Sequence, residues 1–168
     1  QMCIRDRIIA VWPWDAYLGE EALQNGIKVG ISSWRQRSFN AIPPAVKSSA
    51  SYMNSILAKR EATAHGYSEA IMLNEEGRVC EGTGENIFVV RNGILSTPPL
   101  SDGLLEGITR DTILTIATDM DIPAIEESLT RADLYIADEA FMTGSAAELT
   151  PINSIDDRVI GKRGPITE

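Results

Sequence analysis

The sequence predicts an α+β fold, because short strands that follow one another directly are combined with amphipathic helices. The strands are densest from 69 to 97, where Asn92-Gly93 is the strongest short signal for a hairpin turn. Helical spacing of apolar residues appears in a stretch that begins near Ser51 and in another at 109–120. The chain has 168 residues and neither an internal repeat nor a low-complexity linker. One domain with a sizeable core is therefore expected.

The first part of the chain predicts a strand at 8–12, an aromatic loop, a helix at 20–25 that Gly26 ends, and a strand at 27–34. Residues 1–7 carry charges where a signal peptide would have its apolar core. The last residues, with proline and then threonine, are typical of a helix start. A chain that begins in a strand and ends at a helix start is interpreted as a fragment.

The helix near Ser51 carries two kinds of residue on opposite faces. Its apolar face consists of Tyr52, Met53, Ile56 and Leu57. Its polar face consists of Asn54, Lys59 and Glu61. His65, the single histidine, ends this helix before Gly66, and we interpret it as a helix-end residue rather than a catalytic one.

The remaining elements are a run of strands followed by alternating helices and strands. Strands are expected at 69–73, 78–81, 86–90, 94–97, 124–128 and 139–143. The helix at 109–120 has Ile113, Ile116 and Ala117 at core spacing. Thr130 to Asp133 predicts a capping box at the start of a short helix, and 144–151 is expected to be a loop of small and hydroxyl residues.

Charge and cysteine content exclude several classes of protein. A formal charge of −9 argues against nucleic acid or an anionic membrane as a partner, since both require a basic patch. No apolar run approaches the roughly 20 residues that span a bilayer. Cys3 and Cys80 fit neither a metal-ligand spacing nor a disulfide framework, so we expect no metal site and a reducing, cytoplasmic location.

Lys47 stands out because it is the only charged residue between Arg37 and Lys59. The Ile-Pro-Pro-Ala-Val run before it is expected to be extended and partly buried, since proline disfavours helix in itself and in its predecessor. A lysine among apolar and small side chains loses hydration, which favours the neutral amine that imine chemistry with a carbonyl requires. On this stretch alone, an ordinary surface lysine with a solvated amine remains the alternative.

Three further motifs have the composition of binding loops. In 80–88, Glu81 ends a strand before a glycine-flanked turn, although Glu85 is a competing carboxylate and a plain tight turn is the alternative. In 105–111, a glycine directly precedes a helix, whose free amides and dipole suit a phosphate. In 143–151, small residues allow backbone amides and a hydroxyl to approach a ligand, or simply form a tight loop.

In this order and spacing, the motifs resemble the class IV aminotransferases, pyridoxal-phosphate enzymes of fold type IV. The resemblance runs from about Ile8 to Thr167. Within the family, Trp12-Pro13-Trp14-Asp15-Ala16-Tyr17-Leu18-Gly19 is similar to the aromatic segment of the branched-chain amino acid aminotransferases. The implied fold is a mixed-sheet, barrel-like cofactor-binding domain. Residues 8–168 would be this C-terminal domain and 1–7 a non-matching leader, with the family's N-terminal domain and last helix absent.

The resemblance implies roles for residues around the cofactor. Lys47 would form the imine with pyridoxal 5'-phosphate and later act as the base on the substrate Cα. Tyr52 would hydrogen-bond the phenolic oxygen of the cofactor, and Glu81 would pair with its ring nitrogen.

The other implied roles concern the phosphate and the substrate. The phosphate would be bound by the amides of Ile108 and Thr109, which follow Gly107, and by Ser145. Ser145 and Ala146 would bind the substrate carboxylate. The side-chain pocket would be lined by Trp14 and Tyr17.

The implied reaction is transamination between L-branched-chain amino acids (leucine, isoleucine and valine) and 2-oxoglutarate. Partners would be these small molecules and further copies of the chain in a homo-oligomer. Without the family's N-terminal domain, little turnover is expected from this chain alone. The alternatives are a D-amino acid transaminase, an aminodeoxychorismate lyase of the same fold, or a non-catalytic domain that binds a ligand without turnover.

Overall fold

The protein is described by a computed structural model that covers residues 9–11, 13, 18–161 and 163–168. The α-helices are α1 (Glu20–Asn25), α2 (Tyr52–Ala64), α3 (Ile108–Asp119) and α4 (Arg131–Tyr135). Single 3-10 turns lie at Ser49–Ser51 and Leu100–Asp102. The strands are β1 (Ile27–Ile31), β2 (Glu69–Leu73), β3 (Val79–Glu81), β4 (Asn86–Arg91), β5 (Ile94–Thr97), β6 (Ala124–Glu126), β7 (Glu139–Gly144), β8 (Glu148–Ile155) and β9 (Arg158–Val159).

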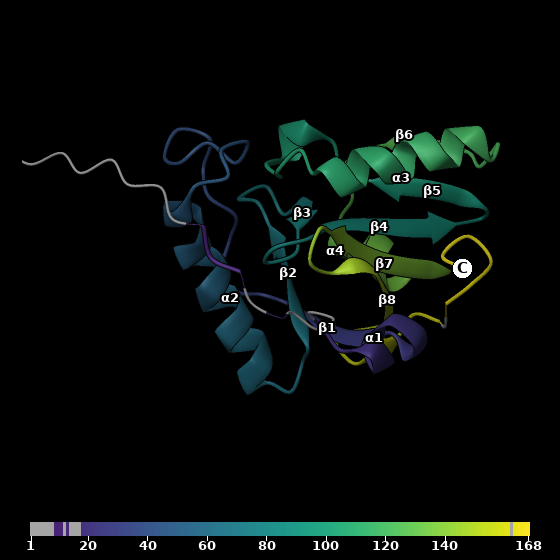
Figure 1. Cartoon of the computed structure of the whole chain (residues 1–168), viewed down its shortest axis with the longest axis horizontal. Helices are drawn as coiled ribbons and strands as arrows, with labels where there is room; N and C mark the ends of the chain where they lie inside the picture. Colours follow the sequence, from purple (N-terminus) through teal and green to yellow (C-terminus); the bar gives the residue numbers. More distant parts are fainter. Residues whose placement is uncertain (1–8, 12, 14–17, 162) are drawn as a thin grey trace, which may run out of the picture.

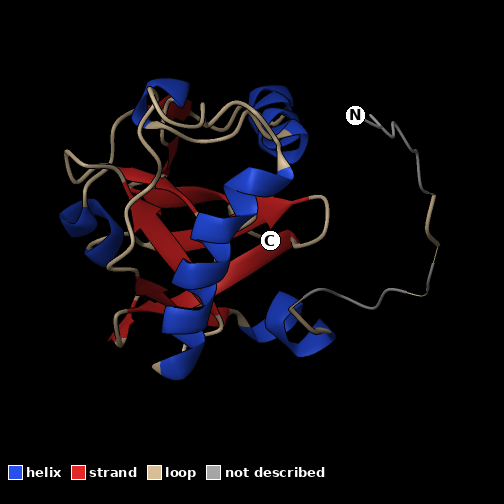
Figure 2. Ribbon diagram, turned by 90° about the vertical axis from the view of Figure 1, so that its left-hand side faces the viewer, coloured by secondary structure: helices blue, strands red, loops and turns tan. Residues whose placement is uncertain are grey.

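Within the described residues the strands form one nine-stranded sheet in the order β3-β2-β1-β8-β7-β4-β5-β6, with β9 paired to β8. β1 pairs in parallel with both β2 and β8, and β5 pairs in parallel with β6. The other pairs are antiparallel. The sheet curls into half a barrel with helices around it (Figures 1 and 2), so the predicted α+β, mixed-sheet, barrel-like fold is confirmed.

The core lies in three apolar clusters along the curled sheet. The largest contains inward side chains of β1, β2, β4, β7 and β8 together with Leu134 of α4. A second lies between α3 and the sheet, where the Phe88 and Phe141 rings stack with centroids 5.1 Å apart. The third is small and joins α2 to β2. Figure 1 shows α3 along the β4–β5 side and α2 at the other end of the sheet, beside β2.

Several local predictions are confirmed. α1 ends at Gly26 as expected, and the β4–β5 hairpin turns at Asn92 and Gly93, whose φ angles of 51° and 77° fit a primed turn. Thr130 and Asp133 form the predicted capping box at the start of α4. In α3, Ala117 is buried and Ile113 packs on the second cluster, but Ile116 is 44% exposed, so that part of the predicted core face is wrong.

The predicted faces of α2 are reversed in the structure. Ala58 and Ala62 are the buried residues of the helix, whereas Met53 is 64% and Ile56 50% exposed. The polar residues turn inward instead. Glu61 accepts hydrogen bonds from Ser32 and Ser33, Lys59 bonds Glu69, and Asn54 donates to the Arg35 carbonyl oxygen.

Two other stretches differ from expectation. Residues 148–151 belong to β8 rather than to a loop, because they continue the antiparallel pairing with β7 as far as Pro151 opposite Phe141. Residues 9–11 have no regular structure and are exposed, while the rest of the predicted 8–12 strand lies outside the described residues. The segment 165–167 forms a turn.

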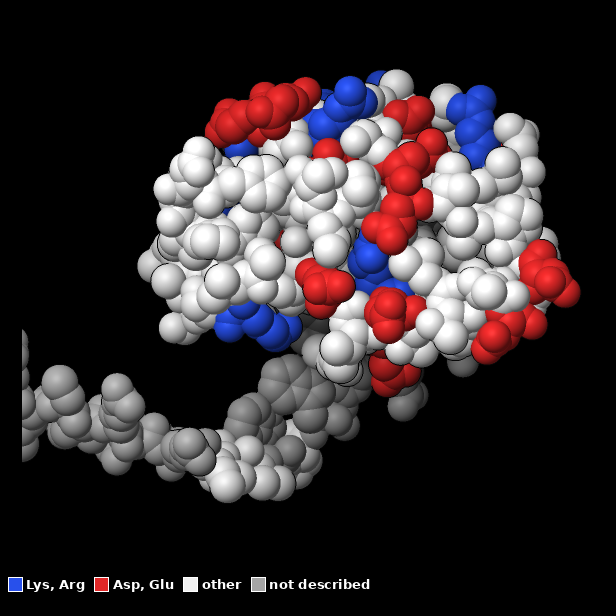
Figure 3. Space-filling model, turned by 90° about the horizontal axis from the view of Figure 1, so that it is seen from above, with Lys and Arg blue, Asp and Glu red and all other residues white. Residues whose placement is uncertain are grey.

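Two further features concern partners. Among the described residues, no helix is both long and apolar enough to cross a bilayer. The face seen in Figure 3 carries acidic side chains interspersed with basic ones, without a continuous basic patch.

Candidate active site

One pocket collects most of the predicted site residues. Its volume is about 320 Å³, and it lies where β3 and β7 end and β4 begins, beside the start of α3 and the segment that leads into α2. The predicted residues that line it are Lys47, Tyr52, Glu81, Gly107, Ile108, Thr109 and Ser145. These residues come from four separate stretches of sequence, and the fold brings them to one cavity.

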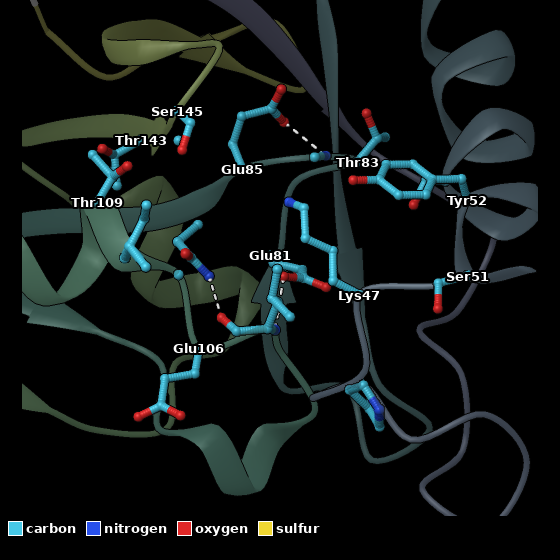
Figure 4. Close-up of a pocket in the computed structure, with 18 of the residues that line it drawn as sticks. Lys47, Ser51, Tyr52, Glu81, Thr83, Glu85, Glu106, Thr109, Thr143 and Ser145 are labelled. Atoms are coloured by element: carbon cyan, nitrogen blue, oxygen red, sulfur yellow. Dashed lines mark hydrogen bonds between the residues drawn. The ribbon is translucent and has the colours of Figure 1, made fainter. Parts of the chain in front are cut away.

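Lys47 enters this pocket from a turn-rich segment rather than from the extended, buried run that the prolines predicted. Pro44 is buried, but Ala45, Val46 and Lys47 are exposed. Figure 4 shows the Lys47 side chain reaching into the cavity, with its amine on the side where Glu81 and the Thr83–Glu85 turn lie. The amine therefore faces the pocket while the pocket wall beside it remains open to water.

Glu81 lies at the end of β3, with both carboxylate oxygens held by donors. Oε1 accepts a hydrogen bond from Gln36 Nε2 at 2.5 Å, and Oε2 accepts one from the Leu105 amide at 3.0 Å. Burial raises the pKa of Glu81 to about 7, although the Leu105 hydrogen bond and the Arg37 charge act in the opposite direction. Two donors from different loops thus fix the direction in which this carboxylate faces the cavity.

Glu85, the competing carboxylate, occupies a different place. Its Oε2 accepts a hydrogen bond from the Gly84 amide at 3.0 Å, and a Cβ on Gly82 would come within 2.7 Å of the same oxygen. Burial and the neighbouring Glu69 charge raise the pKa of Glu85 to about 7. Figure 4 shows its carboxyl group pointing away from Lys47. Of these two carboxyl groups, Glu81 is therefore the one on the Lys47 side of the pocket.

The start of α3 is fixed by Asn86, a residue that the sequence interpretation did not assign to the site. Asn86 lines the pocket and donates from Nδ2 to the Leu105 carbonyl oxygen at 2.9 Å. A Cβ on Gly107 would lie 2.0 Å from Asn86 Oδ1, so any other residue there would displace the Asn86 side chain. No local pattern reveals this role, because Leu105 and Gly107 lie about twenty residues after Asn86 in the sequence.

The β7–β8 connection supplies the remaining wall. Ser145 lines the pocket, while its neighbour Ala146 does not. Thr143, near the end of β7, also lines the pocket; it begins the 143–151 motif, but the sequence interpretation gave it no role of its own. Trp14 and Tyr17, the predicted side-chain pocket, lie outside the described residues.

Arg37 adds a positive charge to the open side of the pocket. It lines the cavity, and its Nη1 donates to the Ser51 carbonyl oxygen at 2.7 Å. The sequence interpretation assigned no role to Arg37 or Gln36, because their contacts join residues that are far apart in the chain.

The other candidate groups lie elsewhere. His65 lines a separate cavity with Tyr67 and Arg131. Cys80 is buried, and burial raises the pKa of its thiol far above the usual range. Within the described residues, no three His, Cys, Asp or Glu side chains gather closely enough to hold a metal ion.

The sequence matches the model of the family described as amino-transferase class IV over residues 6–155. The branched-chain-amino-acid aminotransferase of Pseudomonas aeruginosa is 52% identical over 163 residues, which is 96% of this chain and 53% of that protein. The chain thus spans about half the length of the curated relatives it matches.

Solved structures of branched-chain aminotransferases are similar to this chain as well. A branched-chain aminotransferase of Thermoproteus uzoniensis, crystallised with norvaline, superposes with a TM-score of 0.89 at 53% identity, covering 94% of this chain and 52% of that one. The enzyme of Thermobaculum terrenum in its PLP-form gives a TM-score of 0.86 at 43% identity, covering 92% and 50%. With the family model matching most of its length and relatives of this identity, the chain belongs to the class IV aminotransferases.

Proposed function

We propose that the protein carries out pyridoxal 5'-phosphate-dependent transamination between L-branched-chain amino acids and 2-oxoglutarate, with residues 8–168 as its cofactor-binding domain. The observation that supports this best is the placement of the Lys47 amine and the Glu81 carboxylate in one pocket, beside the N-terminus of α3. The amine, the carboxylate and the helix start match three separate parts of one cofactor.

The residues fit pyridoxal phosphate by the chemistry of their groups. Its aldehyde requires an amine, its ring nitrogen an anionic partner, and its phosphate a set of hydrogen-bond donors. The pocket holds these as Lys47, as Glu81 and as the amides of Ile108 and Thr109 with the Ser145 hydroxyl. The norvaline and PLP-form structures of relatives support the same ligands here.

The bound cofactor would supply an aldehyde that links to amines and a ring that withdraws electrons from the substrate Cα. Lys47 would take the proton from that carbon and return it to the product. Glu81 would hold a proton at the ring nitrogen, and its two donors, Gln36 and the Leu105 amide, would keep it aimed there. The Tyr52 hydroxyl would hydrogen-bond the ring oxygen.

For the substrate, the Ser145 and Ala146 region would bind the carboxylate, and Trp14 and Tyr17 the apolar side chain. Because Lys47 is exposed and Tyr52 41% exposed, water reaches the reacting amine. Catalytic sites of this kind work best with water excluded, so we expect the 168-residue chain to turn over slowly.

The remaining proposals concern assembly and location. We expect a homo-oligomer, supported by Met53 and Ile56, which leave an apolar surface on α2 exposed. A cytoplasmic location is supported by Cys80, a free and buried thiol.

The deciding experiment replaces Lys47 with alanine and follows the absorbance that a lysine-linked cofactor adds when pyridoxal phosphate is titrated into the protein. Wild type should show this band and Lys47→Ala should not, because the amine is gone. Lys28→Ala is the matched control, since Lys28 is exposed on β1 and does not line the pocket.

Persistence of the band in Lys47→Ala would refute the assignment of this lysine. Transamination assays with L-valine and D-alanine, together with lyase assays on aminodeoxychorismate, then separate the proposed substrate class from the two alternatives of the same fold. Product from L-valine alone supports the proposal, and product only from one of the other two contradicts it.

A further inference from the structure

The Thr143 hydroxyl is an exception among the buried threonines of the described residues. Thr143 has no exposed surface, and its Oγ1 has no hydrogen-bond partner in the part of the chain that the structure describes. The other buried threonine hydroxyls all donate, in Thr83, Thr97, Thr150 and Thr167. A buried hydroxyl without a hydrogen-bond partner destabilises the folded protein, so a ligand that accepts its hydrogen would remove this cost.

The register of the sheet directs this hydroxyl towards the start of α3. Thr143 pairs with Asn86 between β7 and β4, and directly opposed residues in an antiparallel pair carry their side chains on the same face. The Asn86 side chain packs against Gly107, the residue before α3. Figure 4 accordingly shows Thr143 beside Thr109 and Ser145, all in the wall of the same cavity.

The surroundings of Thr143 suit an anion. α3 has 12 residues, its first N–H groups have no acceptor within the helix, and its dipole favours negative charge at this end. Thr109 and Ser145 add hydroxyls next to these amides. Three carboxyl groups line the same pocket, those of Glu81, Glu85 and Glu106. Burial raises the pKa of Glu81 and that of Glu85 to about 7, which leaves these two partly neutral near pH 7 and reduces their repulsion of an anion.

We propose that Thr143 is a phosphate-binding residue whose Oγ1–H donates to an oxygen of the phosphate monoester bound at the start of α3. The assignment rests on the proposed function and adds a donor to which the sequence interpretation assigned no role. Ser154 supplies a matched comparison, because its buried hydroxyl also lacks a partner in the described chain but does not line the pocket.

The test measures dissociation constants of pyridoxal phosphate and of pyridoxal, which lacks the phosphate, and the inhibition constant of inorganic phosphate as a competitor. Thr143→Val keeps the shape and removes the hydroxyl. The variant should bind pyridoxal phosphate and inorganic phosphate about tenfold or more weakly, as expected for the loss of a hydrogen bond to a charged group. Its dissociation constant for pyridoxal should stay within twofold of the wild-type value. Thr143→Ser should bind like wild type.

Stability provides an independent readout. Thr143→Val should leave the unfolding free energy of the ligand-free protein unchanged or raised, because it removes a buried polar atom without a partner. Ser154→Ala should do the same without altering the affinity for pyridoxal phosphate. Thr143→Ala is the second variant if valine disturbs the β4–β7 pairing.

Equal losses for pyridoxal phosphate and pyridoxal, or no loss for either, would overturn the assignment of Thr143. A wild-type protein that binds pyridoxal phosphate without the lysine-linked band would instead count against the proposed function. The inorganic phosphate measurement does not need Lys47, so it tests Thr143 in either case.

Discussion

The two walls of the pocket are built in different ways. The sheet wall, which carries Glu81, Gly107 and Thr143, is held by strand pairing, by the fit of Gly107 to Asn86 and by backbone hydrogen bonds. The helix wall, residues 46–56, is exposed over much of its length. The sheet wall thus places the groups that would hold the cofactor, while the lysine that would react lies in the wall with less burial.

α2, which continues the helix wall, packs on β2 through the buried Ala58 and Ala62 and is also held there by a charged pair. Lys59 Nζ lies 2.6 Å from Glu69 Oε2, and Glu69 has no exposed surface. Glu69 Oε1 in turn accepts a hydrogen bond from Thr83, in the turn that lines the sheet wall. The ion pair therefore connects α2 to the turn that lines the sheet wall.

The largest effect is expected from Lys59→Met, which leaves the Glu69 carboxylate buried without its cation. The unfolding free energy should fall by about 3 kcal/mol, the scale for breaking a buried pair from one side. Urea denaturation at pH 7 measures the change. Lys59→Met combined with Glu69→Gln should recover most of the loss, and a single-variant loss below about 1 kcal/mol would contradict a buried anchor.

A smaller, pH-dependent effect is expected in the sheet wall from Glu85→Gln. The pKa of Glu85 is raised from 4.5 to about 7, so between these pH values the folded protein binds more protons than the unfolded chain. The unfolding free energy of the wild-type protein therefore falls as the pH rises from 4.5 to about 7. Glu85→Gln should remove on the order of 2 kcal/mol of that fall between pH 4.5 and pH 8.

Denaturation of wild type and Glu85→Gln at pH 4.5 and pH 8 measures this difference. Glu75→Gln is the matched control, because Glu75 is exposed in the turn between β2 and β3 and should leave the pH dependence unchanged. An identical pH dependence for wild type and Glu85→Gln would mean that Glu85 has the same pKa in the folded protein as in the unfolded chain.

The smallest effect is expected on the outer face of α2. Replacing Met53 and Ile56 together with glutamine should change the unfolding free energy by less than about 0.5 kcal/mol, as is usual for exposed positions. Ala58→Leu, on the buried face of the same helix, should cost about 1–3 kcal/mol through overpacking. A loss of more than about 1 kcal/mol from the glutamine variant would show that this apolar face is covered in solution.

The sequence allowed good predictions where local chemistry decides the structure. The Asn92-Gly93 turn, the Gly26 helix end and the Thr130–Asp133 capping box need only neighbouring residues, and each is confirmed. The pocket positions of Lys47 and Glu81 were also anticipated, from motifs and their resemblance to a family.

The predictions failed where contacts between residues far apart in the sequence determine the structure. The periodicity of α2 favoured burying Met53 and Ile56, but Glu61 and Lys59 have partners on β2 and on the segment after β1, which no local pattern reveals. Small and hydroxyl residues favoured a loop at 144–151, yet residues 148–151 extend β8 in register with β7, and the pairing of β8 with β1 begins at Ile152. Gln36 and Asn86 were missed because their contacts also join separate stretches.

The position of β8 has a consequence for how the chain is completed during synthesis. β8 is the hydrogen-bonded link between β1, β2 and β3 on one side and β7, β4, β5 and β6 on the other. β1 leaves the ribosome more than a hundred residues before β8. The edge of β1 that pairs with β8 therefore stays unpaired until residues 148–155 have been synthesised. Nascent chains stalled before Glu148 are therefore expected to expose strand edges that chaperones and proteases recognise.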